Sequence, residues 1–126
     1  MPPISAAAPS ESQAAALSKA TVRAAQRLGL KNRVLAAVIG LSEPTISRMS
    51  KSEFTLARDS KPFELSAMFV RLFRALDAIV GGDEAVTKAW LLNANTALGD
   101  APINLIQSVS GLVNVVQYLD SRRARI

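Results

Sequence analysis

NRVLAAVIGLSEPTISRMSK, residues 32–51, is the stretch of the chain that decides its fold. Its apolar residues form two short helical patterns that meet at Gly40, a residue type that adopts the positive φ of a tight turn without steric cost. Ala36 is small where the two helices must cross, and Ser42 is a typical N-cap for the second helix. Pro44 lies in the first turn of that helix, where a missing N–H costs nothing. These features together predict a helix-turn-helix.

The second helix of such a motif enters the major groove of DNA, with its first turns nearest the base edges. Arg48 matches the two acceptors of guanine, and Glu43 matches the amino group of cytosine. We expect the polar residues opposite Ile46 and Met49, together with the flanking cations, to contact bases or phosphates. The predicted DNA-contacting residues are Lys31, Arg33, Ser42, Glu43, Thr45, Ser47, Arg48 and Lys51. The alternative is an ordinary helical hairpin whose charged side chains only face water.

The distribution of charge divides the chain into parts with different expected partners. The 126 residues carry a net charge of +5 and are 49% hydrophobic, which is enough for one domain with its own core. Residues 17–60 hold eight Lys/Arg against three Asp/Glu, whereas residues 61–120 hold four against six, and three arginines follow. The basic first half favours a polyanionic partner, and the mildly acidic second half indicates a different one.

Several residue types that carry chemistry are missing. With no Cys and no His, the chain has no disulfide, no thiolate–imidazole metal site and no histidine base. The adjacent carboxylates Asp83 and Glu84 are explained by capping of a helix N-terminus. We therefore rank an enzyme well below a binding protein and expect no cofactor. No stretch is long and apolar enough to span a bilayer, and the leader does not resemble a signal peptide, so a cytoplasmic protein is expected.

The remaining segments predict further helices and no strand, so the expected fold class is all-α. Residues 1–12 are rich in Pro, Ala and Ser and are expected to be a disordered leader. A helix over residues 13–28 follows, and its cations, Lys19, Arg23 and Arg27, are either phosphate contacts or a solvated face. Residues 13–60 would then form the DNA-binding region, with a loop over residues 52–60.

The longest helical pattern begins at Pro62 and ends at Gly81. Its wide apolar stripe is expected to be core and is broad enough to serve a dimer as well, so residues 61–81 are predicted to be a core or dimerisation helix. Residues 82–126 contain a helix capped by Asp83, a turn over residues 95–102, and a final helix that begins at Ser108 or Ser110.

The C-terminal part of the chain resembles the toxin-binding domain of the Xre/MbcA/ParS antitoxins. The resemblance rests on GDEA at 82–85, AWL at 89–91, NTALG at 95–99 and Pro102, followed by Leu105-Ile106, Gly111, and a last helix with Val115 and Leu119. With the helix-turn-helix upstream, it covers residues 17–119. Family members carry a longer, basic polar link where this chain has Gly99-Asp100-Ala101-Pro102, so that basic group is absent here.

The resemblance implies an N-terminal Xre/Cro-like helix-turn-helix bundle, a small helical toxin-binding domain over residues 82–126 with a basic C-terminal tail, and a role in a two-gene toxin–antitoxin system. The usual partner is a RES-domain toxin that depletes NAD, which the antitoxin occludes while its helix-turn-helix binds the operon's own promoter. A homodimer or higher assembly on a two-fold operator is expected. The alternative is a free-standing dimeric repressor whose C-terminal half only dimerises.

Candidate toxin contacts come from the matching motifs, the apolar residues around the turn, and the basic tail. Trp90 is expected either in the core or at this interface, and Leu98, Ile103 and Ile106 are expected to form an exposed apolar anchor. The tail arginines either provide solubility or reach a toxin pocket that accepts the phosphates of NAD. The expected toxin-contacting residues are Trp90, Asn95, Leu98, Gly99, Pro102, Ile103, Ile106, Arg122, Arg123 and Arg125.

Overall fold

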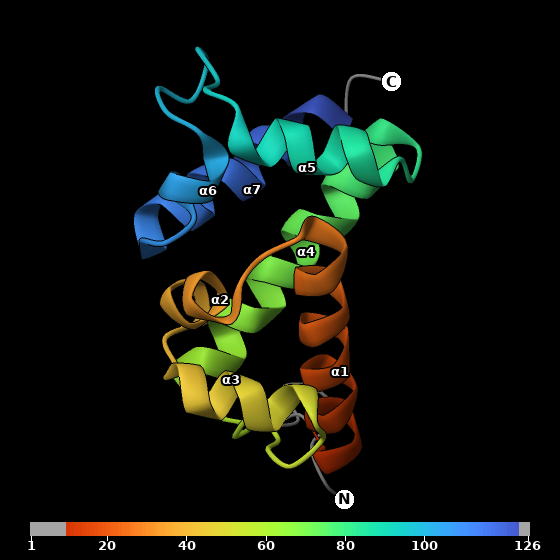
Figure 1. Cartoon of the computed structure of the whole chain (residues 1–126), viewed down its shortest axis with the longest axis vertical. Helices are drawn as coiled ribbons and strands as arrows, with labels where there is room; N and C mark the ends of the chain where they lie inside the picture. Colours follow the sequence, from red (N-terminus) through yellow and green to blue (C-terminus); the bar gives the residue numbers. More distant parts are fainter. Residues whose placement is uncertain (1–9, 124–126) are drawn as a thin grey trace, which may run out of the picture.

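The computed structural model describes residues 10–123, and this part of the chain is helical with no strand beyond an isolated bridge between Asn95 and Asp100. Figure 1 shows α1, α2 and α3 in the lower part of the molecule and α5, α6 and α7 in the upper part, with α4 passing through both. The helices of the described part are α1 (Glu11–Leu28), α2 (Asn32–Ile39), α3 (Glu43–Ser50), α4 (Lys61–Val80), α5 (Glu84–Leu92), α6 (Pro102–Leu105) and α7 (Val109–Arg123). The all-α prediction is confirmed.

Helix α1 begins earlier than predicted. Ser10 is its N-cap: the Ser10 hydroxyl accepts from the Gln13 N–H at 3.2 Å, and the Gln13 side chain accepts from the Ser10 N–H at 2.7 Å. This reciprocal capping box satisfies two backbone donors that a helix terminus would otherwise leave unpaired. The prediction of a leader as far as residue 12 is therefore wrong for its last residues, and residues 1–9 lie outside the described part.

The helix-turn-helix forms as predicted. Gly40 ends α2 with φ 76°, and Ser42 caps α3 by accepting from the Thr45 N–H at 3.3 Å. Ala36 is buried, as a close helix crossing requires. On α3, Ile46 and Met49 point into the core.

Helix α4 joins the two halves of the molecule. It packs against α1 and α2 on one side of the molecule and against α5 and α7 on the other. Phe69, Leu72 and Leu76 on its inner face are fully buried in one continuous core, so the predicted core role of the stripe is confirmed. Ile79 near its end is 41% exposed, and the dimer role of the helix stays a prediction.

Two local contacts hold the connections between helices. Leu56 in the loop after α3 is buried, and its N–H donates to the Ser18 hydroxyl of α1 at 2.9 Å. At the other end, Ser108 caps α7 by accepting from the Gly111 N–H at 3.1 Å, which settles the two starts left open by the sequence. Buried Gly111 lies directly against the backbone of Leu105, where α6 ends.

Candidate functional site

The outer face of α3 is the first candidate surface. Ile46 and Met49 point inward, so the opposite side of α3 faces solvent. On that side lie Pro44, Arg48 and Lys51, which follow one another at intervals of about one helical turn, Lys51 being the C-cap. Pro44 is not among the predicted DNA-contacting residues, although the sequence places it in the first turn of this helix. The surface it forms with Arg48 and Lys51 is called the α3 crest below.

The other predicted residues of α3 lie beside the crest. Glu43 is exposed in the first turn, whereas Thr45 and Ser47 are half-buried, so the expected placement of these two directly opposite the buried residues is wrong. The Thr45 hydroxyl bonds to the Ser42 hydroxyl at 2.9 Å and accepts from an Arg48 guanidinium N–H at 3.1 Å. Thr45 therefore holds the Ser42 hydroxyl and the Arg48 guanidinium in place through these two hydrogen bonds.

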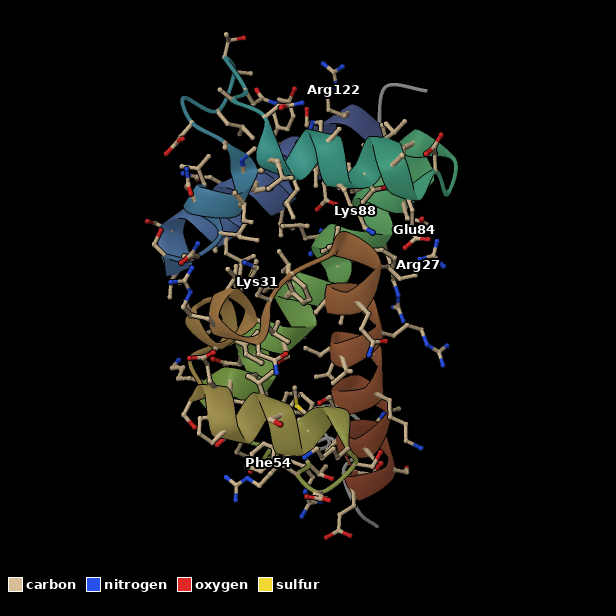
Figure 2. All side chains as sticks on the ribbon, in the orientation of Figure 1. Arg27, Lys31, Phe54, Glu84, Lys88 and Arg122 are labelled. Carbon is tan, nitrogen blue, oxygen red and sulfur yellow. The ribbon has the colours of Figure 1, made fainter. Side chains whose placement is uncertain are left out.

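Basic residues also flank the start of α2. Figure 2 shows Lys31 on the connection between α1 and α2. Lys31 and Arg33 are both exposed, and neither forms an ion pair with a carboxylate among residues 10–123. Their side chains are therefore accessible, and their contact with phosphates stays a prediction.

The cations of α1 have two different environments. Arg27 lies 3.8 Å from the Asp77 carboxylate and stacks over the Phe73 ring of α4 at 5.8 Å, so it ties α1 to α4. Lys19 and Arg23 are exposed and line the groove between the two helices. Arg27 therefore fits neither of the two predicted roles for these cations, phosphate contact or a solvated face.

The turn between α5 and α6 uses its polar residues to hold its own shape. The Asn95 side-chain oxygen accepts from the N–H groups of Ala97 and Leu98, at 2.9 and 3.2 Å, and Gly99 has φ 90°. Leu98 is half-buried against the core. These residues give the turn a fixed conformation, with Gly99 at the surface.

The apolar anchor expected after this turn is only partly available. Ile106 has an exposed fraction of 0%, and Pro102 is also buried, so the prediction that Ile106 is an exposed anchor is wrong. The physical reason is that α6 is a single turn whose last residues close the core between α5 and α7. Trp90 and Ile103 are half-buried against the same core.

Exposed apolar side chains occur instead on α5. Val86 and Leu92 are 49% and 61% exposed, and together with exposed Ala85 and Ala89 they form what we call the α5 ridge. The opposite face of α5 buries Thr87 and Leu91. The sequence contained a usable signal, because the apolar residues of this helix, Ala85, Val86, Ala89, Trp90, Leu91 and Leu92, cover more of its circumference than one core face needs.

The basic C-terminal residues are part of α7 as far as Arg123. Arg122 stacks over the Tyr118 ring at 5.7 Å and projects from the molecule in Figure 2. Arg123 lines a groove of about 430 Å³ between α1 and α4, whose walls include Arg71 and Arg74. Arg71 is ion-paired with Asp120 of α7. Arg125 lies outside the described residues.

Residues 10–123 contain neither a membrane-spanning helix nor a cluster of metal-ligating side chains. None of the helices described there is long and apolar enough to cross a membrane. In the same part of the chain, no three acidic side chains come together as a potential metal site.

A helix-turn-helix and a second helical unit with an exposed apolar ridge are the architecture expected of a DNA-binding protein that also binds a protein partner. Residues 7–71, more than half of the chain, match the antitoxin Xre-like helix-turn-helix domain. Residues 75–125 match the antitoxin Xre/MbcA/ParS C-terminal toxin-binding domain. The chain therefore belongs to the Xre-type antitoxins, and its partners are DNA and a toxin. No curated protein matches the sequence.

Proposed function

We propose that this chain is the antitoxin of a type II toxin–antitoxin pair, that it neutralises a RES-domain, NAD-degrading toxin by direct contact, and that it represses its own operon. The observation that carries the proposal is the presence of two exposed surfaces of different chemistry in one chain, the polar and basic α3 crest and the apolar α5 ridge. The two matching domains supply the corresponding activities, DNA binding and toxin binding. No enzymatic role is proposed, because these domains bind their partners.

The α5 ridge is the proposed toxin contact. Leu92 and Val86 are the most exposed large apolar side chains of the helix, and burying such side chains is the usual source of affinity at a protein interface. Leu92→Glu places a charge in that interface, so we expect at least a tenfold weaker toxin complex. Ala37→Glu is the matched control, because it adds the same charge at an exposed position of α2. Equal affinities of the two variants for the toxin would contradict this placement.

The basic C-terminal residues are proposed to add a second toxin contact, at the pocket that accepts NAD. Arg122 projects from the end of α7, and Arg125 follows it in the sequence. Guanidinium groups match phosphate or carboxylate ligands with paired hydrogen bonds. A chain that lacks residues 121–126 should therefore neutralise the toxin less well, and full neutralisation by the truncated chain would exclude the contact.

Repression requires a second copy of the chain. One helix-turn-helix reads only one half-site, so we propose that a homodimer or higher assembly places two α3 helices on a two-fold operator. Size measurement of the purified chain with and without operator DNA tests this step.

The proposal as a whole is tested by expressing the tagged chain together with its flanking genes and measuring the molecular mass of the purified complex. A stoichiometric complex with a neighbour that stops growth when expressed alone, and that consumes NAD, supports it. If the chain elutes alone and still binds its promoter, the protein is a free-standing repressor. A toxin that leaves NAD levels unchanged would preserve the antitoxin role but remove the RES assignment.

A further inference from the structure

The α3 crest combines one apolar and one guanidinium group at the end of the helix that approaches the bases. Pro44 is the second residue of α3 and is exposed, and Arg48 follows it four residues later on the same face. The proline ring has no donor or acceptor, so it contributes only carbon surface. A proline in the first turn suits the start of a helix, and here its exposed ring also places an apolar group at the N-terminal end of the crest.

The guanidinium of Arg48 is held back toward the N-terminal end of α3 by Thr45. One of its terminal nitrogens donates to the Thr45 hydroxyl at 3.1 Å, and that hydroxyl is itself bonded to the Ser42 hydroxyl at 2.9 Å. The Arg48 side chain therefore folds back toward the helix N-terminus instead of extending along the helix. It forms no ion pair with the carboxylates of residues 10–123, so its remaining N–H groups are free to donate.

This geometry sets the spacing of the two groups on DNA. Their Cα atoms are about 6 Å apart along the helix axis, from the rise of four residues. The hydrogen bond to Thr45 brings the Arg48 guanidinium back to the level of the residue that follows Pro44. The axial separation of the two groups is therefore smaller than that of their Cα atoms and comparable to the step of about 3.4 Å between neighbouring bases, so we expect them to reach adjacent base pairs.

We propose that α3 reads a thymine next to a guanine: Arg48 donates to O6 and N7 of the guanine, and the Pro44 ring packs on the 5-methyl group of the thymine. Guanine is the base that offers a guanidinium two acceptors in the major groove, and thymine is the base that presents a methyl group there. The inference deepens the proposed operator binding and rests on it. It assigns part of the specificity of this helix to a residue whose side chain makes no hydrogen bond.

The experiment uses the full-length chain and its own operator, located by footprinting upstream of its gene. Each thymine of the operator is replaced in turn by deoxyuridine, which removes only the methyl group, and Kd is measured at one fixed salt concentration. We expect one thymine per half-site, adjacent to a guanine, at which the wild-type chain binds about fourfold more weakly, the factor that burial of one such group gives.

Two further duplexes separate the methyl group from the rest of the base. Replacing that T·A pair with 5-methylcytosine·G restores the methyl group and should return affinity to within about twofold, whereas unmethylated C·G should not. Replacing the adjacent guanine with 7-deazaguanine removes the N7 acceptor, and this should weaken the wild-type chain but not Arg48→Ala.

Pro44→Ala is the decisive variant, because it should bind the thymine and deoxyuridine duplexes equally well. Ser50→Ala, which changes an exposed residue of α3 beside the crest, should keep the full wild-type sensitivity to the methyl group. If Pro44→Ala keeps that sensitivity, or if no single deoxyuridine weakens the wild-type chain, the inference is wrong and operator binding still stands. If the chain does not bind its operator at all, the repressor half of the proposed function fails first.

Discussion

Gly111 is a position at which one added methyl group tests the packing of the C-terminal half. A Cβ at this residue would lie 1.9 Å from the Leu105 carbonyl oxygen and 2.7 Å from the Leu105 carbonyl carbon. Both are backbone atoms, and ordinary contact begins at 3.4 Å, so the start of α7 and the end of α6 would have to separate by about 1.5 Å. The same carbonyl accepts from the Ser108 hydroxyl at 3.3 Å, so the cap of α7 would be disturbed too.

The expected effect of Gly111→Ala is the difference of two opposing contributions. Overpacking of a tight core costs up to about 3 kcal/mol. Replacing glycine by alanine inside a helix returns about 1 kcal/mol. The free energy of unfolding should therefore fall by about 2 kcal/mol, which corresponds to a fall in Tm of about 8 °C for a domain of this size.

Urea and thermal unfolding followed by circular dichroism measure this change. Asn114→Ala is the control, because Asn114 is exposed on α7 and its replacement should shift stability by no more than about 0.5 kcal/mol. A Gly111→Ala protein as stable as the wild type, or more stable, would show that α6 and α7 are not in the close contact described.

Three further changes test the contacts that hold the DNA-binding half. Ser18→Ala leaves the buried Leu56 N–H without its acceptor and should lower the free energy of unfolding by about 1–3 kcal/mol in a urea titration; wild-type stability would contradict the contact. Ser42→Ala should cost about 1 kcal/mol through loss of the α3 cap, whereas Ser42→Asp should retain most of it in the same assay. Lys31→Ala should reduce the slope of log Kd against log salt by about 1 for any DNA sequence, while Lys88→Ala on α5 should leave it unchanged.

The helix-turn-helix could be predicted from sequence because its determinants are local. Gly40, Ser42 and Pro44 each act within one turn of the backbone, so their residue types alone define where one helix ends and the next begins. The same holds for Asp83, which caps α5 as expected by accepting from the Val86 N–H at 3.1 Å.

The positions that could not be predicted depend on contacts between distant segments. Ile106 follows a turn and has the features of a surface anchor, but the docking of α6 buries it completely. Ser18 and Thr21 are polar and yet buried. Their burial is tolerated because each hydroxyl donates to the carbonyl four residues earlier, at 2.8 and 2.7 Å. A prediction that places polar residues at the surface is therefore wrong for both. The α5 ridge could not be located from the sequence, because its position follows from which face of α5 is buried in the structure.

The continuous path of α4 has a consequence for how such proteins diversify. The two matching domains meet between residues 71 and 75, which is the middle of this helix and not a loop. An exchange of genetic material at that point joins half of one helix to half of another, and the new half must fit the buried surface of the old one. A new toxin-binding domain therefore brings with it half of the α4 of the chain from which it came. Recombinants between related chains should fold far more often than recombinants between unrelated ones.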